Sequence, residues 1–212
     1  MNTREVILDK RKNQSTPGTT GNGAPLPLQF GAKLKAARRH SGLSLRALGT
    51  QTGFSASFLS QVELGQVSPS LASLDRITHA LGVRLSDLLS EPAVTNGPVL
   101  RRKEQASLRS EWSRATVQSL LPAGVNDRVA VVLIRLEPGG RSGKSPLLHT
   151  GEELAFCVRG KATVVLDEER YELTEGDSLF YDATQPSRWE NTGKRRAEVL
   201  LISFSQRQIT PP

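Results

Sequence analysis

Residues 44–65, SLRALGTQTGFSASFLSQVELG, are the stretch that most constrains how this chain can fold. Two short segments with apolar residues at helical spacing stand on either side of a turn that contains Gly53. Ser44 and Ser55 stand where the two helices would begin, because a hydroxyl there can accept a hydrogen bond from an otherwise unpaired backbone N–H. The pattern predicts two helices joined by a tight turn, which is typical of a helix-turn-helix.

The same signals recur on both sides of this stretch. Ser70 is a further candidate for the start of a helix, and glycines at 42, 53, 65 and 82 stand where helices would end. Between these marks the apolar residues repeat at helical spacing, from Phe30 to Leu89. The N-terminal part is therefore predicted to form five short helices around one small core.

The length and charge of the chain favour two domains of different character. The chain has 212 residues and a formal net charge of +7, and the sequence pattern changes near residue 92. Residues 1–92 hold 11 Lys and Arg against 6 Asp and Glu, whereas residues 93–212 hold 17 against 15. Most of the basic excess thus accompanies the helix-turn-helix pattern, a combination that favours binding to nucleic acid.

The composition also bears on where the protein works. Cys157 is the single cysteine, which excludes an intramolecular disulfide, and no run of about 18 apolar residues is present to span a membrane. Residues 1–29 combine basic side chains with a Thr-, Gly- and Pro-rich stretch and do not resemble a signal peptide. We expect a cytoplasmic protein without membrane contact, in which residues 1–29 form a flexible basic arm. That arm is either a disordered tail or a source of additional phosphate contacts.

Residues 30–90 resemble the helix-turn-helix domain of the XRE (Cro/C1-type) repressor family, most specifically in SLRALGTQTGFSASFLSQVELG and PSLASLDRITHALGV. The resemblance implies a five-helix, lambda-repressor-like DNA-binding domain whose second motif helix, about residues 55–64, enters the major groove. Hydroxyl and amide side chains there would read base edges, and basic and hydroxyl groups nearby would hold phosphates. Glu63, close to this face, is expected to be structural, by orienting an arginine or closing the turn. The candidate DNA-binding residues are Arg38, Arg39, Ser44, Arg46, Ser55, Ala56, Ser57, Ser60 and Gln61.

The segment 91–98, EPAVTNGP, marks the expected linker, because its two prolines and glycine prevent a helix from crossing it. After it, short β-type runs alternate with turn signals such as EPGG and TEGD. The spacing indicates an all-β sandwich or barrel. No nucleotide-binding glycine pattern and no serine nucleophile elbow is present in the sequence, so nucleotide-cofactor and hydrolase functions have no support. The expected strands are 129–136, 154–158, 162–166, 178–181 and 197–204.

Residues 99–205 resemble a small cupin barrel, a double-stranded β-helix, and we place this domain at 99–212. The similarity is clearest over HTGEELAFCVRGKATVVLDEERYELTEGDSLFYDATQPSRWENTG. Of the four metal-ligand positions of metal-binding cupins, this chain keeps His149 and Glu153 but has Leu147 and Ser187 at the other two. A 2-His-1-carboxylate triad cannot be assembled from one histidine and one glutamate, so no metal cofactor is expected. The remaining pair is a residual metal site, a set of polar anchors for a small organic ligand, or a structural pair.

A ligand site in the barrel would use side chains that alternate along a strand, which places Glu153 on one face with Cys157 and Arg159. Aromatic walls with a few polar groups fit a small polar metabolite such as an amino acid, an amine or a carboxylate. Cys157 lies in an apolar run and is expected to be a small core residue rather than a redox sensor. The candidate ligand-binding residues are Arg135, His149, Glu153, Cys157, Arg159, Tyr181, Ser187 and Trp189.

Together the two resemblances imply a sequence-specific DNA-binding transcriptional regulator, with repression the expected direction, whose cupin domain senses a small-molecule effector. We expect no enzymatic activity, and a homodimer formed through the cupin domain that binds a double-stranded operator of two-fold symmetry. One alternative is a metal-dependent cupin dioxygenase or isomerase fused to a DNA-binding head. The other is a nucleoid-like protein without sequence preference, disfavoured because residues 55–64 are rich in Ser and Gln rather than Lys.

Overall fold

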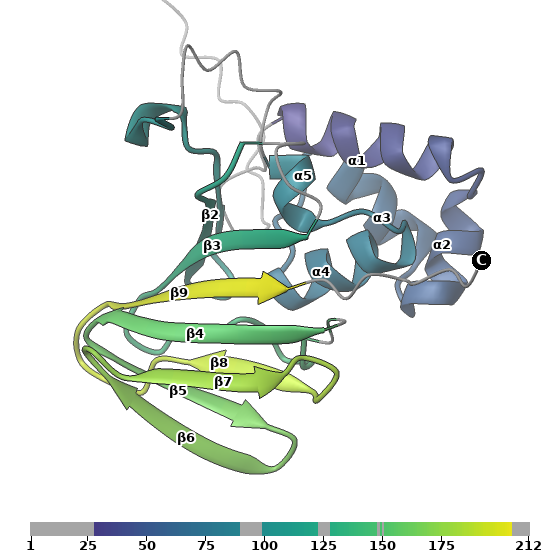
Figure 1. Cartoon of the computed structure of the whole chain (residues 1–212). Coiled ribbons are helices and arrows are strands. Elements are labelled where there is room, and N and C mark those ends of the chain that lie inside the picture. Colours follow the sequence, from purple (N-terminus) through teal and green to yellow (C-terminus); the bar gives the residue numbers. More distant parts are fainter. Residues whose placement is uncertain (1–27, 90–98, 123–127, 148, 150, 205–212) are drawn as a thin grey trace, which may run out of the picture.

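A helical domain is followed by a β domain in the computed structural model, which describes residues 28–89, 99–122, 128–147, 149 and 151–204 (Figure 1). Five α-helices come first, then a short 3-10 helix, η1 (Arg102–Glu104), and then nine strands. This order confirms the expected fold class. The expected linker at 91–98 and most of the expected arm at 1–29 lie outside the described residues, although residues 28 and 29 already belong to the first helix.

The ends of the helices follow the sequence signals closely. Ser44, Ser55 and Ser70 each cap a helix as predicted, and each accepts a hydrogen bond from the backbone N–H three residues further on. Gly53 ends the second helix with φ at 70°, a left-handed conformation that glycine adopts without steric cost. The helices are α1 (Leu28–His40), α2 (Leu45–Thr52), α3 (Ala56–Glu63), α4 (Leu71–Ala80) and α5 (Leu85–Leu89).

The core of the helical domain is formed by buried aliphatic side chains from all five helices, among them Leu34, Leu48, Leu59, Ile77 and Leu88. The apolar spacing in the sequence predicted these inward faces. α1 and α3 also approach each other closely at Gly31, where a Cβ atom would lie 2.4 Å from the carbonyl oxygen of Glu63. The absence of a side chain at Gly31 therefore allows α1 to pack closely against α3, the second helix of the helix-turn-helix.

The β domain consists of two antiparallel sheets whose buried apolar side chains are continuous with those of the helices. One sheet has the order β1-β2-β3-β9-β4-β7, and the other has the order β6-β5-β8. The strands are β1 (Ser107–Ser110), β2 (Ala115–Ser119), β3 (Val129–Leu136), β4 (Glu152–Arg159), β5 (Lys161–Leu166), β6 (Glu169–Thr174), β7 (Ser178–Asp182), β8 (Ser187–Glu190) and β9 (Ala197–Phe204). β3, β4, β5, β7 and β9 occupy the five predicted runs. β1, β2, β6 and β8 were not predicted, because they are short and contain many polar residues.

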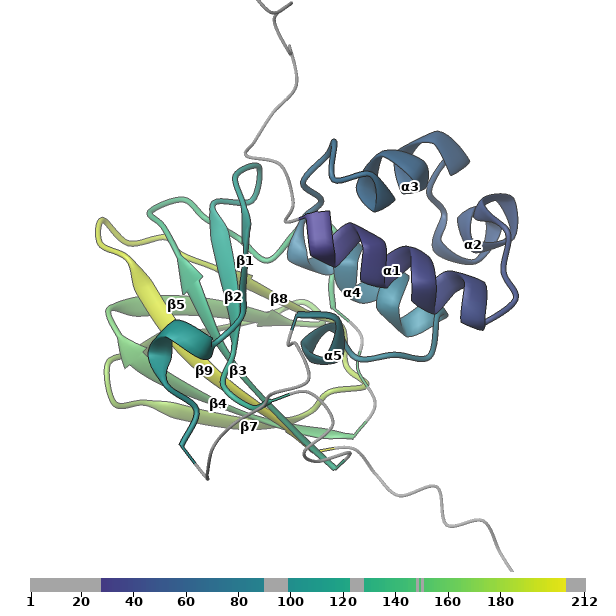
Figure 2. The ribbon, with the colours of Figure 1, turned by 90° about the horizontal axis from the view of Figure 1, so that it is seen from above.

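The helical domain packs against one end of the β domain, close to the ends of strands β3, β4 and β9 (Figures 1 and 2). The backbone N–H of Ala72 in α4 donates a hydrogen bond to the carbonyl of Ser142 at 3.1 Å, and the Ser68 hydroxyl donates to the carbonyl of Arg109 at 3.3 Å. At Gly143, a Cβ atom would lie only 2.5 Å from the Cβ of Ala72. The two domains are therefore in direct contact through α4. None of the described helices has the length and apolar character needed to cross a membrane.

Candidate functional site

The first candidate surface is formed by the exposed residues at the start of α2 and along α3. Arg39, Ser44, Arg46, Ser55, Ser57 and Gln61 are exposed, and Ala56 and Ser60 are half-buried. Ser44 and Ser55 cap α2 and α3 by accepting hydrogen bonds from the backbone N–H groups of Ala47 and Phe58, and the first N–H groups of a helix have no acceptor within the helix itself. Helix N-termini, hydroxyls and guanidinium groups suit anionic oxygens, so this surface has the chemistry that phosphate contacts require.

Arg38 departs from the expectation of a phosphate contact. Its side chain is 9% exposed, and its Nε and Nη2 atoms donate to the two carboxylate oxygens of Glu63 at 2.6 and 3.0 Å. Its remaining nitrogen, Nη1, donates to the carbonyl of Leu43 at 2.8 Å. The structural role expected for Glu63 is thus to hold Arg38 between α1 and α3, and the guanidinium is turned away from the outer surface. A buried carboxylate attracts the nearest cation, which removes Arg38 from the set of exposed basic groups.

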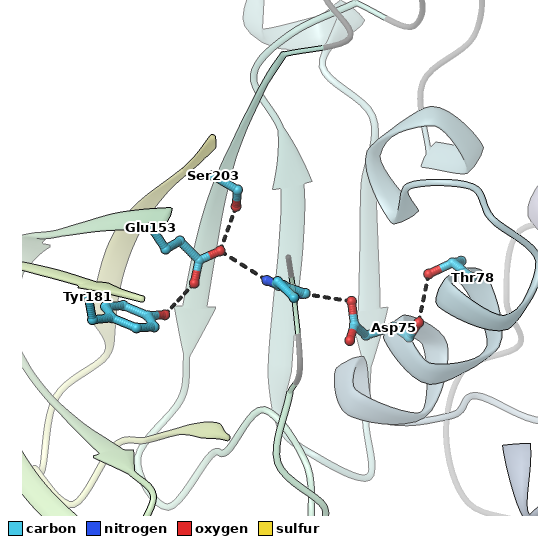
Figure 3. A network of polar contacts seen from close by, with 6 residues as sticks. Asp75, Thr78, Glu153, Tyr181 and Ser203 are labelled. Atoms are coloured by element: carbon cyan, nitrogen blue, oxygen red, sulfur yellow. Dashed lines mark hydrogen bonds and ion pairs between the residues drawn. The ribbon is translucent and has the colours of Figure 1, made fainter. Parts of the chain in front are cut away.

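The second candidate site is a chain of polar contacts that runs from α4 into the β domain (Figure 3). Glu153, on β4, is 1% exposed, and its carboxylate accepts hydrogen bonds from the hydroxyls of Tyr181 and Ser203. The same carboxylate contacts His149 Nδ1 at 3.1 Å, and His149 Nε2 contacts the Asp75 carboxylate on α4 at 2.8 Å. One imidazole therefore connects a carboxylate of the helical domain to a buried carboxylate of the β domain.

The protonation of these groups follows from their mutual contacts. Burial disfavours the charged imidazolium, but the hydrogen bonds and charges of Asp75 and Glu153 outweigh it and raise the pKa of His149 well above its usual 6.5. Burial also works against the Glu153 carboxylate, but its contacts with His149, Ser203 and Tyr181 lower the pKa of Glu153 from 4.5. Burial, together with the Glu153 charge, raises the pKa of Tyr181, so this phenol stays neutral. The raised pKa of His149 and the lowered pKa of Glu153 both favour the ion pair between the imidazolium and the buried carboxylate.

A pocket of about 180 Å³ lies directly beside this chain of contacts, between α4, α5 and the open end of the barrel. Its apolar wall comes from the inner faces of β2, β3 and β9, and its polar groups include Asp75, His149, Glu153 and Ser203. The volume is below the range of pockets for drug-sized molecules, about 300–1,000 Å³, so the space suits a small metabolite. The other lining residues are Leu71, Thr78, His79, Val83, Arg84, Leu85, Ser86, Val117, Ala130, Val132, Ile134, Leu147 and Leu201.

The candidate ligand-binding residues divide into those that line the pocket, those buried deeper in the barrel, and two arginines that lie outside both. His149 and Glu153 line the pocket, whereas Cys157, Tyr181, Ser187 and Trp189 are buried deeper in the barrel. Burial raises the pKa of the Cys157 thiol, which agrees with a core residue.

Arg135 and Arg159 do not belong to this pocket. The neighbours of Arg135 on β3, Ile134 and Leu136, are buried, so Arg135 points to the face of the sheet that lies away from the pocket. Its Nε atom lies 3.7 Å from the carboxylate of Glu198 there. Arg159 was expected to share the inner face with Glu153, but a β-bulge between Cys157 and Arg159 shifts the register and places Arg159 opposite Glu198, on the exposed side. The alternation used in the prediction fails at that bulge.

The residues present do not fit a metal ion. Leu147 and Ser187 stand at two of the positions that carry metal ligands in metal-binding cupins, and they pair with each other in an isolated β-bridge. Neither side chain offers the imidazole or carboxylate that such a site requires. Both ring nitrogens of His149 are already engaged by carboxylates. Within the described part of the chain, no group of three or more His, Cys, Asp or Glu side chains is arranged to hold a metal.

Asp75 and Ser203 were missed by the sequence analysis. Asp75 is 74 positions from His149 and in a different domain, and Ser203 is 50 positions from Glu153. Neither residue belongs to a local motif that points to this site. The packing of α4 on the open end of the barrel brings Asp75 to His149, and the pairing of β9 with β4 places Ser203 opposite Glu153.

Comparison with known proteins agrees with both halves of this description. Residues 29–90 match a family model described as a helix-turn-helix domain, and residues 132–203 match one described as a cupin domain. The HTH-type transcriptional regulator PuuR of Escherichia coli (strain K12) is 24% identical over 170 residues, which cover 80% of this chain and 91% of PuuR. SutR, another HTH-type transcriptional regulator of the same strain, is 26% identical over 162 residues, covering 76% of this chain and 86% of SutR.

A solved structure resembles this chain over both of its domains. The crystal structure of an HTH_3 family transcriptional regulator from Vibrio cholerae superimposes with a TM-score of 0.67 at 26% identity. The superposition covers 84% of this chain and 96% of that one, so it spans the helical and the β domain together.

Proposed function

Because this chain belongs to the XRE-type helix-turn-helix regulators that have a cupin domain, we propose that it controls its DNA binding through a small molecule held between the two domains. The chain is a DNA-binding transcriptional regulator, like the relatives it matches over most of their length. We further propose that DNA binding is controlled at a site between the domains, that the operator has two-fold symmetry, and that the chain has no enzymatic activity.

For DNA binding, we assign the base-reading role to the outward residues of α3 and the phosphate-binding role to residues before it. Ser57 and Gln61 are exposed on α3, and their hydroxyl and amide groups can both donate to and accept from base edges. Arg39 and Arg46 are exposed on α1 and α2 and supply positive charge beside the helix N-termini. A homodimer would present two copies of α3 to an operator of two-fold symmetry.

The observation that supports control by a small molecule is the composition of the pocket wall. Residues of α4 and α5 form one side, residues of the barrel form the other, and the Asp75–His149 contact closes the gap between them. A molecule bound there contacts both domains at once, so its affinity depends on how they are packed. A ligand shifts an equilibrium only by its differential affinity for the two states, which for regulated proteins is typically about 1–3 kcal/mol.

We propose that the chain is not an enzyme, because two of the four positions that supply metal ligands in metal-dependent cupins carry no metal-binding side chain here. Leu147 and Ser187 occupy those positions. The direct test is a metal assay on protein purified without chelator and without a histidine tag. Stoichiometric iron, manganese or zinc would contradict the proposal and favour a dioxygenase or isomerase.

The proposal is tested first by retaining genomic DNA fragments on the purified full-length protein at near-physiological salt and sequencing them. We expect an enriched inverted repeat upstream of a few genes. Retention without any enriched motif would contradict sequence-specific regulation.

Metabolites handled by the products of those genes are then tested as effectors. We expect one of them to bind with an affinity that differs between free protein and operator complex, by about 5- to 150-fold. Glu153→Gln should abolish this binding, because it removes a buried charge that lines the pocket. Glu198→Gln, a carboxylate on the opposite face of the same sheet, is the matched control and should bind normally. Equal affinity in both states would exclude the mechanism.

A further inference from the structure

The β domain carries a group of two cations around one exposed tryptophan. Trp112 lies in the turn between β1 and β2 and is 40% exposed. The guanidinium carbon of Arg141 lies 5.2 Å from the centre of the indole ring, and the ammonium nitrogen of Lys144 lies 5.6 Å from it, which are distances of cation–π contacts. Both cationic side chains are exposed. We call Trp112, Arg141 and Lys144 the basic patch.

The positive charge of the basic patch is not neutralised by the carboxylates beside it. Glu111, in the same turn, is held by Arg109, with Nε and Oε1 2.6 Å apart. Glu190, which forms an isolated backbone bridge with Arg141, is held by two other arginines at 2.8 and 2.9 Å. No ion pair between described residues includes Arg141 or Lys144. A guanidinium stacked on an aromatic ring keeps its N–H edge free for a planar or tetrahedral anion, so the patch offers two charges to an anionic partner.

The patch is fixed beside the segment that follows α3. The Ser68 hydroxyl, in that segment, donates to the carbonyl of Arg109 at 3.3 Å, three residues before Trp112. At the start of α4, the backbone N–H of Ala72 donates to the carbonyl of Ser142 at 3.1 Å, between the two cations of the patch. Figure 2 shows the turn between β1 and β2 on the same side of the molecule as α3. A surface that meets α3 from that side therefore also meets the β domain at this turn.

We propose that the basic patch binds DNA phosphates beside the half-site that α3 reads, so that the β domain contributes directly to DNA binding. The inference rests on the proposed function for its DNA-reading helix, but not on the effector. A helix in the major groove, about 12 Å wide, lies between two rows of phosphates, so cations next to the end of that helix are placed to meet one of the rows. Contacts of this kind position the protein on the duplex and carry no sequence information.

The same placement gives the domain packing an influence on DNA affinity. The patch belongs to the β domain and α3 to the helical domain, and the two hydrogen bonds of Ser68 and Ala72 lie between them. A shift of the barrel relative to α4 would move the patch away from the phosphates while α3 stays in the groove. DNA affinity would then fall without a change in sequence preference.

The first test is the salt dependence of binding to the operator duplex, measured with the full-length protein and with R141Q/K144Q. Two lost phosphate contacts should lower the slope of log affinity against log salt by about 2 and raise the Kd at 0.15 M salt by about 10- to 30-fold, equally for matched and mismatched operators. K194Q/R195Q is the matched control. It removes the same two charges from exposed positions between β8 and β9, at the end of the barrel away from the helices (Figure 1), and should change the Kd by less than about 2-fold.

A second test locates the patch on the DNA without relying on affinity. Cys157, the single cysteine, is buried, so an iron chelate that cleaves nearby DNA can be attached selectively to Lys144→Cys. We expect strand cleavage beside the half-site from position 144 and none from Lys194→Cys, the matched control. Urea denaturation of each variant, with a midpoint equal to that of the wild type, establishes that it is folded.

Three results would overturn this inference: an unchanged salt slope in R141Q/K144Q, an equal loss of affinity in K194Q/R195Q, or no cleavage from position 144. The comparison is repeated on a duplex of random sequence, because phosphate contacts do not depend on sequence. A reduced salt slope on that duplex supports the inference even if no operator is found. A reduced slope together with equal effector affinity in free and DNA-bound protein supports it as well, while contradicting the proposed control by an effector.

Discussion

Arg38 and Arg39 are adjacent in the chain, but their surroundings are opposite. Arg39 is exposed at the end of α1, while Arg38 is fixed by the buried carboxylate of Glu63 and the carbonyl of Leu43. A buried ion pair adds little to stability compared with apolar residues of the same volume, yet the loss of one partner leaves the other charge without compensation. The pair therefore specifies how α1 packs on α3.

We predict that Arg38→Met lowers the free energy of unfolding by about 3 kcal/mol, because the Glu63 carboxylate, 8% exposed, loses its partner. The measurement is urea denaturation of the full-length protein. The double variant R38M/E63L should recover most of the loss. Arg39→Met should change the free energy by less than about 0.5 kcal/mol and instead weaken DNA binding uniformly across sequences. Equal stability of the Arg38 and Arg39 variants would contradict this account.

At the scale of single elements, α3 has only eight residues and depends on its cap and on the core for its position. Leu59 and Val62 anchor its buried side, and Ser55 closes its N-terminus by accepting from the Phe58 N–H at 3.1 Å. We expect the cap to matter for DNA binding as well, because it fixes the direction of the first turn of α3, the helix that we propose reads the bases.

We predict that Ser55→Ala destabilises the helical domain by about 1 kcal/mol, the usual cost of losing a serine cap. Ser57 lies two residues after Ser55 and is exposed. Ser57→Ala should change the free energy of unfolding by less than about 0.5 kcal/mol and should instead change the discrimination between operator sequences. Chemical denaturation and competition binding with altered operators distinguish the two effects. If Ser57→Ala destabilised the domain as much as Ser55→Ala, the assigned roles would be wrong.

Strand β4 shows how one element can serve two surfaces. Up to Cys157 its alternation directs Glu153, Ala155 and Cys157 into the barrel, and after the bulge Arg159 lies on the outer side. A period of two predicts side-chain directions only while the ladder is regular. The sequence offers Gly160 as a turn signal but no sign of the bulge itself, which forms where β4 pairs with β9.

At the scale of the whole molecule, α4 connects the DNA-binding motif to the barrel. It packs in the helical core through Leu74 and Ile77, and it contacts the barrel through Ala72 and Asp75. The Asp75–His149–Glu153 contacts are sensitive to pH, because the pKa of His149 is higher in the folded protein than in the unfolded chain. The stabilising effect of the imidazolium is therefore complete below pH 6.5 and declines as the pH rises through the raised pKa.

We predict that contact between the domains weakens as the pH rises through the pKa of His149. The protection factor of the Ala72 amide, which donates to Ser142 across the interface, should fall in that pH range. Asp75→Asn should lower the pKa of His149 and move the transition to lower pH, and His149→Gln should remove it. His79→Gln, which changes the other histidine of the pocket lining, should leave it in place. A pH dependence of the Ala72 protection factor that stayed the same in both Asp75→Asn and His149→Gln would contradict the assignment.

The sequence by itself determined the two domains, the caps and ends of the helices, and five of the nine strands found among the described residues, because these depend on local turn chemistry and on periodicity. It also identified His149 and Glu153 as a pair and the absence of a complete metal-ligand set. Only the tertiary structure decided that Arg38 is buried, that Arg159 faces outward, and that Asp75 completes a site between the domains. Those outcomes depend on contacts between residues far apart in the chain, whose free energies no local pattern encodes.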